Sequence, residues 1–86
     1  MPKMRAKLYV SSVKRNVGEA GQVTSEQVEF YGVSKSGSYP ADGLDEDNTY
    51  AKFSPQAHFA ITIANPALFE SFVPGQRYYV DFTAAE

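Results

Sequence analysis

The stretch Met4-Arg5-Ala6-Lys7-Leu8-Tyr9-Val10-Ser11-Ser12-Val13 decides the fold class, because apolar and polar side chains alternate along it. Its apolar residues at positions 6, 8 and 10 are separated by Arg5, Lys7 and Tyr9. Successive side chains of a β-strand point to opposite faces, so a period of two is typical of a strand with one buried face and one solvated face. The stretch therefore predicts a half-buried strand.

A second strand is predicted at 23–33, and we expect it to pair with the first strand as a hairpin. The connecting residues 15–22 include two glycines and an asparagine, which suit a chain reversal. Val23 is out of phase with Val28, so we expect a bulge near Ser25–Glu26 or a strand that starts late.

The charges of the two strands are lopsided. The first strand and the residues next to it carry only basic charged residues: Lys3, Arg5, Lys7, Lys14 and Arg15. The second strand carries only acidic ones, Glu26 and Glu29. Opposite charges facing each other across a strand pair are worth roughly 0.2–1 kcal/mol per pair. Pairing of the strands thus explains the charge pattern without an external partner.

Three further strands and one short helix are predicted after the long loop Ser34–Asn48. The strand candidates are Thr49–Phe53, Ala57–Ala64 and Arg77–Thr83. Asn65-Pro66 is a helix start, with Asn as the N-cap and Pro at the first helical position. The helix that follows, at 67–72, has room for one to two turns.

These elements predict an all-β, mainly β protein with a single small domain spanning 1–86. Five antiparallel strands can remove their exposed edges by closing into a small barrel or sandwich. A helical turn before the last strand is typical of an SH3-like barrel, and an OB-like barrel is the alternative. The phenylalanines are expected in the core: Phe30, Phe53, Phe59, Phe69, Phe72 and Phe82. Ile61 is also expected to point inward, so that Ile61→Asp would unfold the domain.

Composition and charge exclude several classes of function. The 86 residues include 8 basic and 10 acidic side chains, a net charge of −2, with a pI of about 5.3. This balance disfavours a strongly basic nucleic-acid binder. The absence of Cys excludes thiol catalysis and thiolate metal sites. We find no catalytic constellation and no apolar run of ~20 residues, so we expect no enzyme, no cofactor and no membrane span.

The C-terminal half resembles a group of small, mostly uncharacterised proteins encoded by tailed bacteriophages. The resemblance rests on three segments: DNTYAKFSP (47–55), ITIANPALF (61–69) and PGQRYYVDFT (74–83). The strand at 4–13 is weaker support, and the loop at 34–48 matches no pattern of the group. The resemblance implies a phage protein located in the host cytoplasm or in the virion. It implies no catalytic residue.

Two sets of residues are candidates for an interaction surface. The first strand presents Arg5, Lys7 and Tyr9 outward, and Tyr79 points outward from the last strand. The loop carries four acids: Asp42, Asp45, Glu46 and Asp47. Their oxygens suit Ca²⁺ or Mg²⁺, but their spacing is not that of an EF-hand, so we interpret the loop as solvated and expect no metal.

The single histidine and the tyrosines are candidates for chemistry or for base stacking. His58 has no nucleophile context, so we interpret it as an outward residue of the fourth predicted strand rather than a catalytic one. Aromatic and cationic side chains on one sheet face, such as Tyr9 with Arg5 and Lys7, are also how barrels stack single-stranded bases. The acidic composition argues against that use. The simpler interpretation is that Tyr9 packs its ring at the rim of the core and keeps its hydroxyl in solvent.

The sequence therefore predicts a non-catalytic phage protein that acts through protein–protein contacts. The partner is another copy, a phage structural protein or a host protein. One hypothesis is a small virion or assembly component, or an accessory protein. The alternative is an inhibitor of a bacterial defence protein. Binding of single-stranded nucleic acid is a third and less favoured function.

Overall fold

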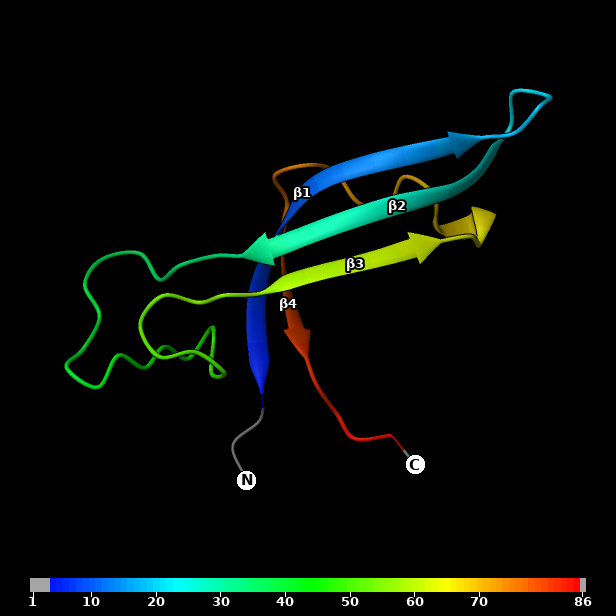
Figure 1. Cartoon of the computed structure of the whole chain (residues 1–86). Helices are drawn as coiled ribbons and strands as arrows, with labels where there is room; N and C mark the ends of the chain where they lie inside the picture. The colour runs from blue at the N-terminus through cyan, green and yellow to red at the C-terminus, as the bar shows by residue number, and fades with distance from the viewer. Residues whose placement is uncertain (1–3, 86) are drawn as a thin grey trace.

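Four strands form one open antiparallel sheet in the computed structural model, which describes residues 4–85 (Figure 1). The elements are β1 (Arg5–Val17), β2 (Val23–Gly32), β3 (His58–Ile63), the 3-10 turn η1 (Pro66–Leu68) and β4 (Arg77–Asp81). Their order across the sheet is β3-β2-β1-β4. The mainly β class is confirmed.

The predicted hairpin of β1 and β2 is present. The amide of Gly18 donates to the carbonyl of Gln22 at 2.7 Å, which closes the connection between the strands. The pairing slips where Asn16 faces Ser25 and Val17 faces Val23, so Thr24 is the extra residue. The expected bulge is thus present, one residue before its predicted place.

A second irregularity bends β1, and the sequence analysis did not predict it. Val10 faces Phe30 but Ser12 faces Glu29, so Ser11 is bulged. β1 pairs with β4 before this point and mainly with β2 after it; Leu8 and Tyr9 alone pair on both sides. The sheet therefore has two arms that share β1, which changes direction between them (Figure 1).

The predicted strand at Thr49–Phe53 is wrong: the structure has turns there. The segment binds β1 through two side chains and a backbone hydrogen bond from the Thr49 amide to the Arg5 carbonyl at 3.0 Å, which do not continue into a ladder. The Oδ1 atom of Asn48 accepts from the Lys7 amide at 2.9 Å, and the Oγ1 atom of Thr49 accepts from the Arg5 amide at 2.8 Å. The loop thus lies beside the first half of β1 without becoming a strand.

The sheet stays open, so the closed five-stranded barrel of the prediction is not what the structure shows. The radius of gyration is 15.9 Å, against roughly 12 Å for a compact domain of this length. The principal axes measure 56 × 34 × 15 Å. The expected helix is also shorter than predicted: Asn65 does cap a turn that begins at Pro66, but the turn ends at Leu68.

The core lies on one face of the sheet and is small. Its buried apolar residues come from three strands: Ala6, Leu8, Val10, Val28, Phe30 and Ile63. Phe69, Phe72, Tyr78 and Val80 are partly buried against them. The prediction that all the listed phenylalanines are core is wrong for Phe53, Phe59 and Phe82, which are exposed. Phe53 lies in the loop, where its ring contacts Tyr39, and no second layer covers Phe59 and Phe82.

Within residues 4–85 there is no helix long and apolar enough to cross a membrane.

Candidate interaction surfaces

Tyr79 is the centre of a polar cluster on the outer face of β1 and β4. The guanidinium of Arg5 lies over its ring, 4.5 Å from the centroid, and Lys7 Nζ lies 5.9 Å from it. The hydroxyl of Tyr79 donates to Asp47 Oδ1 at 3.0 Å, and Lys7 Nζ is 3.5 Å from Asp47 Oδ2. The structure therefore brings together four of the predicted surface residues from three separate segments.

Arg5 is held by a carboxylate as well as by the ring. Its Nε and Nη2 atoms donate to the two oxygens of Asp81 at 2.7 and 3.1 Å. The hydrogen bond and the charge of Asp81 raise the pKa of Arg5 above its ordinary value. The guanidinium is thus fixed in one position beside Tyr79.

A second group of side chains forms a row across all four strands. In register, Arg77 of β4 faces Tyr9, Tyr9 faces Tyr31 of β2, and Tyr31 faces His58 of β3. The rings of Tyr9 and Tyr31 are 6.4 Å apart, and those of Tyr31 and His58 are stacked at 4.8 Å. His58 Nε2 lies 3.0 Å from Glu29 Oε2, so its outward position is as predicted. The sequence analysis placed Tyr9 on this face but did not foresee the row.

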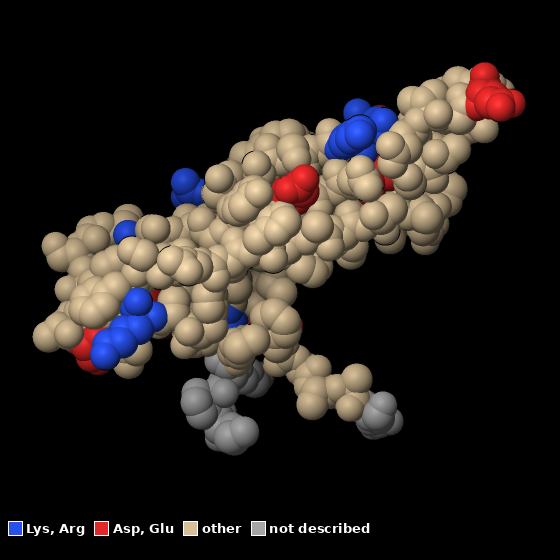
Figure 2. All heavy atoms as spheres, viewed as in Figure 1, with Lys and Arg blue, Asp and Glu red and all other residues tan. Residues whose placement is uncertain are grey.

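The arrangement of these rings bears on nucleic-acid binding. Single-stranded bases stack on the open faces of aromatic side chains. Tyr31 and His58 turn their ring faces toward each other, with planes 23° apart, so those faces are already covered. Acidic and basic side chains are also interspersed over the surface seen in Figure 2, with no continuous basic stripe. One face of each of these two rings is therefore unavailable to a base, and the mixed charges around the row provide no basic groove for a phosphate backbone.

Two of the acidic side chains, Asp42 and Asp45, accept hydrogen bonds from within their own loop. Asp45 accepts hydrogen bonds from the Asp47 amide and from the side chain of Asn48, at 2.9 and 3.0 Å. Asp42 accepts from the Leu44 amide at 3.1 Å, which is a local turn. In the part of the chain that the structure describes, no three His, Asp or Glu side chains are grouped to hold a metal ion.

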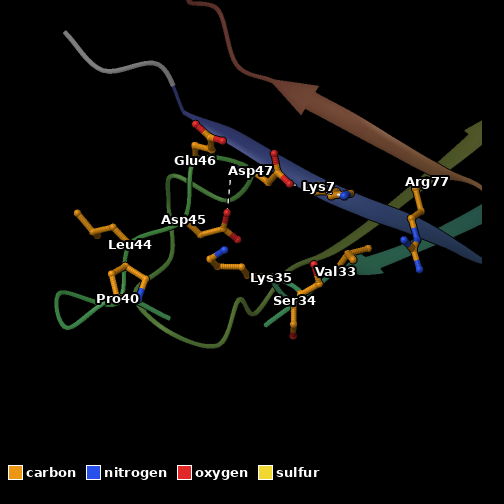
Figure 3. A pocket seen from close by; sticks show the side chains of 11 residues that line it. Lys7, Val33, Ser34, Lys35, Pro40, Leu44, Asp45, Glu46, Asp47 and Arg77 are labelled. Atoms are coloured by element: carbon orange, nitrogen blue, oxygen red, sulfur yellow. Dashed lines mark hydrogen bonds and ion pairs between the residues drawn. The ribbon is translucent and has the colours of Figure 1, made fainter. Parts of the chain in front are cut away.

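This loop forms one wall of a hollow of about 460 Å³. Figure 3 shows Asp45, Glu46 and Asp47 on one side of it and Lys7 and Arg77 on another. Lys35 also lines it. Because three acids and three bases share the hollow, it has no net charge that would select an anion or a cation. Of the predicted acids, Asp42 is the one that does not line it.

The opposite face of the sheet has an apolar groove that the sequence analysis missed. Its volume is about 370 Å³, and its apolar wall includes Met4, Ala6, Leu8, Phe59, Val80 and Phe82. Met4 and Phe82 come from the two ends of the chain, brought together by the pairing of β1 with β4. The sequence predicted Ala6, Leu8, Phe59 and Phe82 on the buried face, but alternation does not tell whether a second layer covers that face.

The other half of that face is covered by the crossover from β3 to β4. This segment passes behind β1 and β2 in Figure 1. Phe72 packs edge-on against Phe30, with ring centroids 5.3 Å apart. Both oxygens of Glu26 accept from the Glu70 amide, at 3.1 and 3.3 Å, and Arg15 Nε donates to Glu26 at 2.8 Å. The buried carboxylate thus fastens the crossover to the sheet.

In comparisons with protein-family models, curated proteins and solved structures, nothing matches the chain. The likeness to phage proteins stays a prediction.

Proposed function

We propose that the chain is a non-catalytic bacteriophage protein that acts through protein–protein contacts as a small virion or assembly component. One observation carries the proposal: a single-layer sheet leaves half of its apolar face uncovered. Soluble monomers rarely expose large contiguous apolar patches, and such patches are typical of interaction sites.

The groove supports a contact with an apolar segment of a phage structural protein. Phe82, at 55% exposure, and Met4, at 46%, stand at its rim. Its floor is formed by Ala6 and Leu8, which are buried. Exposed large side chains around a buried floor give a partner's side chain both a pocket and an apolar rim, which is the usual design of a protein contact.

The same contact would complete the predicted fold. A single sheet buries one face only when another layer packs on it. A partner segment seated on Leu8 and Val80 would supply that layer, and the sandwich expected from the sequence would then form between two chains rather than within one.

The alternative is inhibition of a host defence protein, for which the exposed carboxylates of Asp42 and Glu46 offer a charged surface. Nucleic-acid binding has less support, because the net charge is −2 and the face seen in Figure 2 has no continuous basic stripe.

The test measures the chain in particles of the phage that encodes it. Quantitative mass spectrometry of purified particles should find wild-type chain at a fixed stoichiometry. A Met4→Ser/Phe82→Ser double variant should be at least tenfold depleted, while Thr83→Ala, an exposed change next to the groove, should be incorporated normally. Absence of the wild-type chain from particles, together with retention of a single host protein at fixed stoichiometry, would favour the inhibitor instead.

A further inference from the structure

The two edges of the sheet differ in charge. β4, at one edge, begins with Arg77 and ends with Asp81. β3, at the other edge, reads His-Phe-Ala-Ile-Thr-Ile and has no Lys, Arg, Asp or Glu. Natural proteins protect edge strands with charged side chains, with proline or with a covering segment, because an unpaired edge is a template for another strand. β4 has such charges, and β3 has none.

β3 also presents large apolar side chains at this unprotected edge. Phe59 and Ile61 are 40% and 42% exposed on the apolar face. Ala60 and Thr62, on the opposite face, are small and exposed. The strand is thus amphipathic and neutral, and its residues from His58 to Thr62 are exposed, while Ile63 at its end is buried.

We propose that two copies of this chain pair antiparallel through β3, with the two-fold axis at Ala60. In this register Phe59 of one copy faces Ile61 of the other, and His58 faces Thr62. Apolar side chains meet on one face and polar side chains on the other, and no like charges are opposed. Two four-stranded sheets then become one sheet of eight strands. The inference deepens the proposed contact function, since it names a second copy as one partner.

A second copy fits this edge better than a charged partner strand. An isologous contact needs a surface that is complementary to itself. A neutral strand with its large apolar residues at 59 and 61, symmetric about Ala60, meets that condition. A strand with Lys or Glu at matching positions would leave those charges without an opposite charge on β3.

The absence of Cys allows a direct test by cross-linking. On the axis, the two Ala60 Cα atoms would lie within the 4.4–6.8 Å that a disulfide requires. Thr62 is on the same face of the same strand, but in this register its copies are four residues apart along the paired strands, about 13 Å. Under mild oxidation, Ala60→Cys should form a covalent dimer, and Thr62→Cys should stay mostly monomeric.

Light scattering on the unmodified chain gives the second readout. The wild type should have twice the 9.5 kDa of one chain. Ala60→Lys should weaken the dimer at least tenfold, because on the axis it places two like charges directly opposite each other. Ser12→Lys, an equal charge on the inner strand β1 beside Glu29, should leave the dimer intact. Circular dichroism checks that each variant is folded.

Several outcomes would overturn the inference: a monomeric wild type, cross-linking of Thr62→Cys but not of Ala60→Cys, or Ala60→Lys and Ser12→Lys variants that dimerise equally well. None of these results changes whether the chain is found in phage particles. Conversely, a β3 dimer that is absent from particles would refute the proposed function and leave the dimer standing.

Discussion

The two halves of the apolar sheet face are built from similar residues, but only one of them is covered by another segment. In the covered half, Phe30 is 3% exposed and contacts the rings of Phe59, Phe72 and Tyr78. In the open half, Phe82 is 55% exposed at the rim of the groove. The difference comes from which loop crosses the face, and it shows that alternation along a strand determines which face is apolar but not whether it is covered.

The two long connections explain this difference. The crossover from β3 to β4 must pass from one edge of the sheet to the other, so it lies over the face and delivers Phe69 and Phe72 to the core. The loop between β2 and β3 joins neighbouring strands. It uses Asn48 and Thr49 to bind the edge of β1 and leaves the adjoining face largely open.

The largest expected effect contrasts Phe30 with Phe82. Phe30→Ala should lower the free energy of unfolding by about 3–5 kcal/mol, because it leaves a cavity under Phe72. Phe82→Ala should lower the free energy of unfolding by less than about 1 kcal/mol, because about half of the Phe82 side chain is already exposed to solvent. Urea denaturation of both variants measures the difference. Equal losses would mean that the groove is closed in solution.

A smaller effect concerns the carboxylate that holds the crossover. Glu26 is 1% exposed, and Glu70, whose amide it binds, has a φ of 66°. Glu26→Ala should lower the free energy of unfolding by about 2–3 kcal/mol, because it leaves the Glu70 amide and the Arg15 guanidinium without this acceptor. Glu29→Ala, whose partner His58 is exposed, should cost less than about 1 kcal/mol. Thermal unfolding, at roughly 4–8 °C per kcal/mol, separates the two. Similar shifts would mean that Glu26 does not anchor the crossover.

Much of the fold was predictable because local patterns determine it. The alternation at 4–13, the glycine-rich turn and the phase change after Val23 predicted the hairpin and its bulge. The strand at Thr49–Phe53 was not predictable in the same way. Whether a segment beside β1 forms a continuous backbone ladder, or only the few bonds that Asn48 and Thr49 make, depends on tertiary position, which no local pattern contains.

The candidate site was predictable in its members but not in its arrangement. Arg5, Lys7, Asp47 and Tyr79 do meet on one face. Their contacts with one another depend on the pairing of β1 with β4, which joins residues more than 70 positions apart. The groove on the other face was missed, because it results from a covering layer that is absent from half of the sheet.

The next prediction revises the expectation for Ile61. From the sequence, Ile61→Asp is expected to unfold the domain, but in the structure Ile61 is 42% exposed at the β3 edge. The Ile61→Asp variant should stay folded but fail to dimerise, and its free energy of unfolding should fall by about 1–2 kcal/mol. Val28→Asp, at the register partner of Ile61, should abolish folding because Val28 is fully buried. Circular dichroism and light scattering report both results. An unfolded Ile61→Asp chain would restore the original interpretation.

The smallest effect concerns Tyr50, which lies between the two halves. Its hydroxyl is buried and has no hydrogen-bond partner among the described residues, and burial raises the pKa of Tyr50 above its ordinary value. Tyr50→Phe should therefore leave stability unchanged or raise it by up to about 1 kcal/mol near pH 7. A raised folded-state pKa gives stability that is present below the ordinary pKa of about 10 and is lost as pH rises past it. The wild type should thus lose more stability than Tyr50→Phe between pH 9 and about 11, measured by urea denaturation at each pH. Parallel losses in the two proteins would show that the hydroxyl reaches water, and hence that the open half extends under Tyr50.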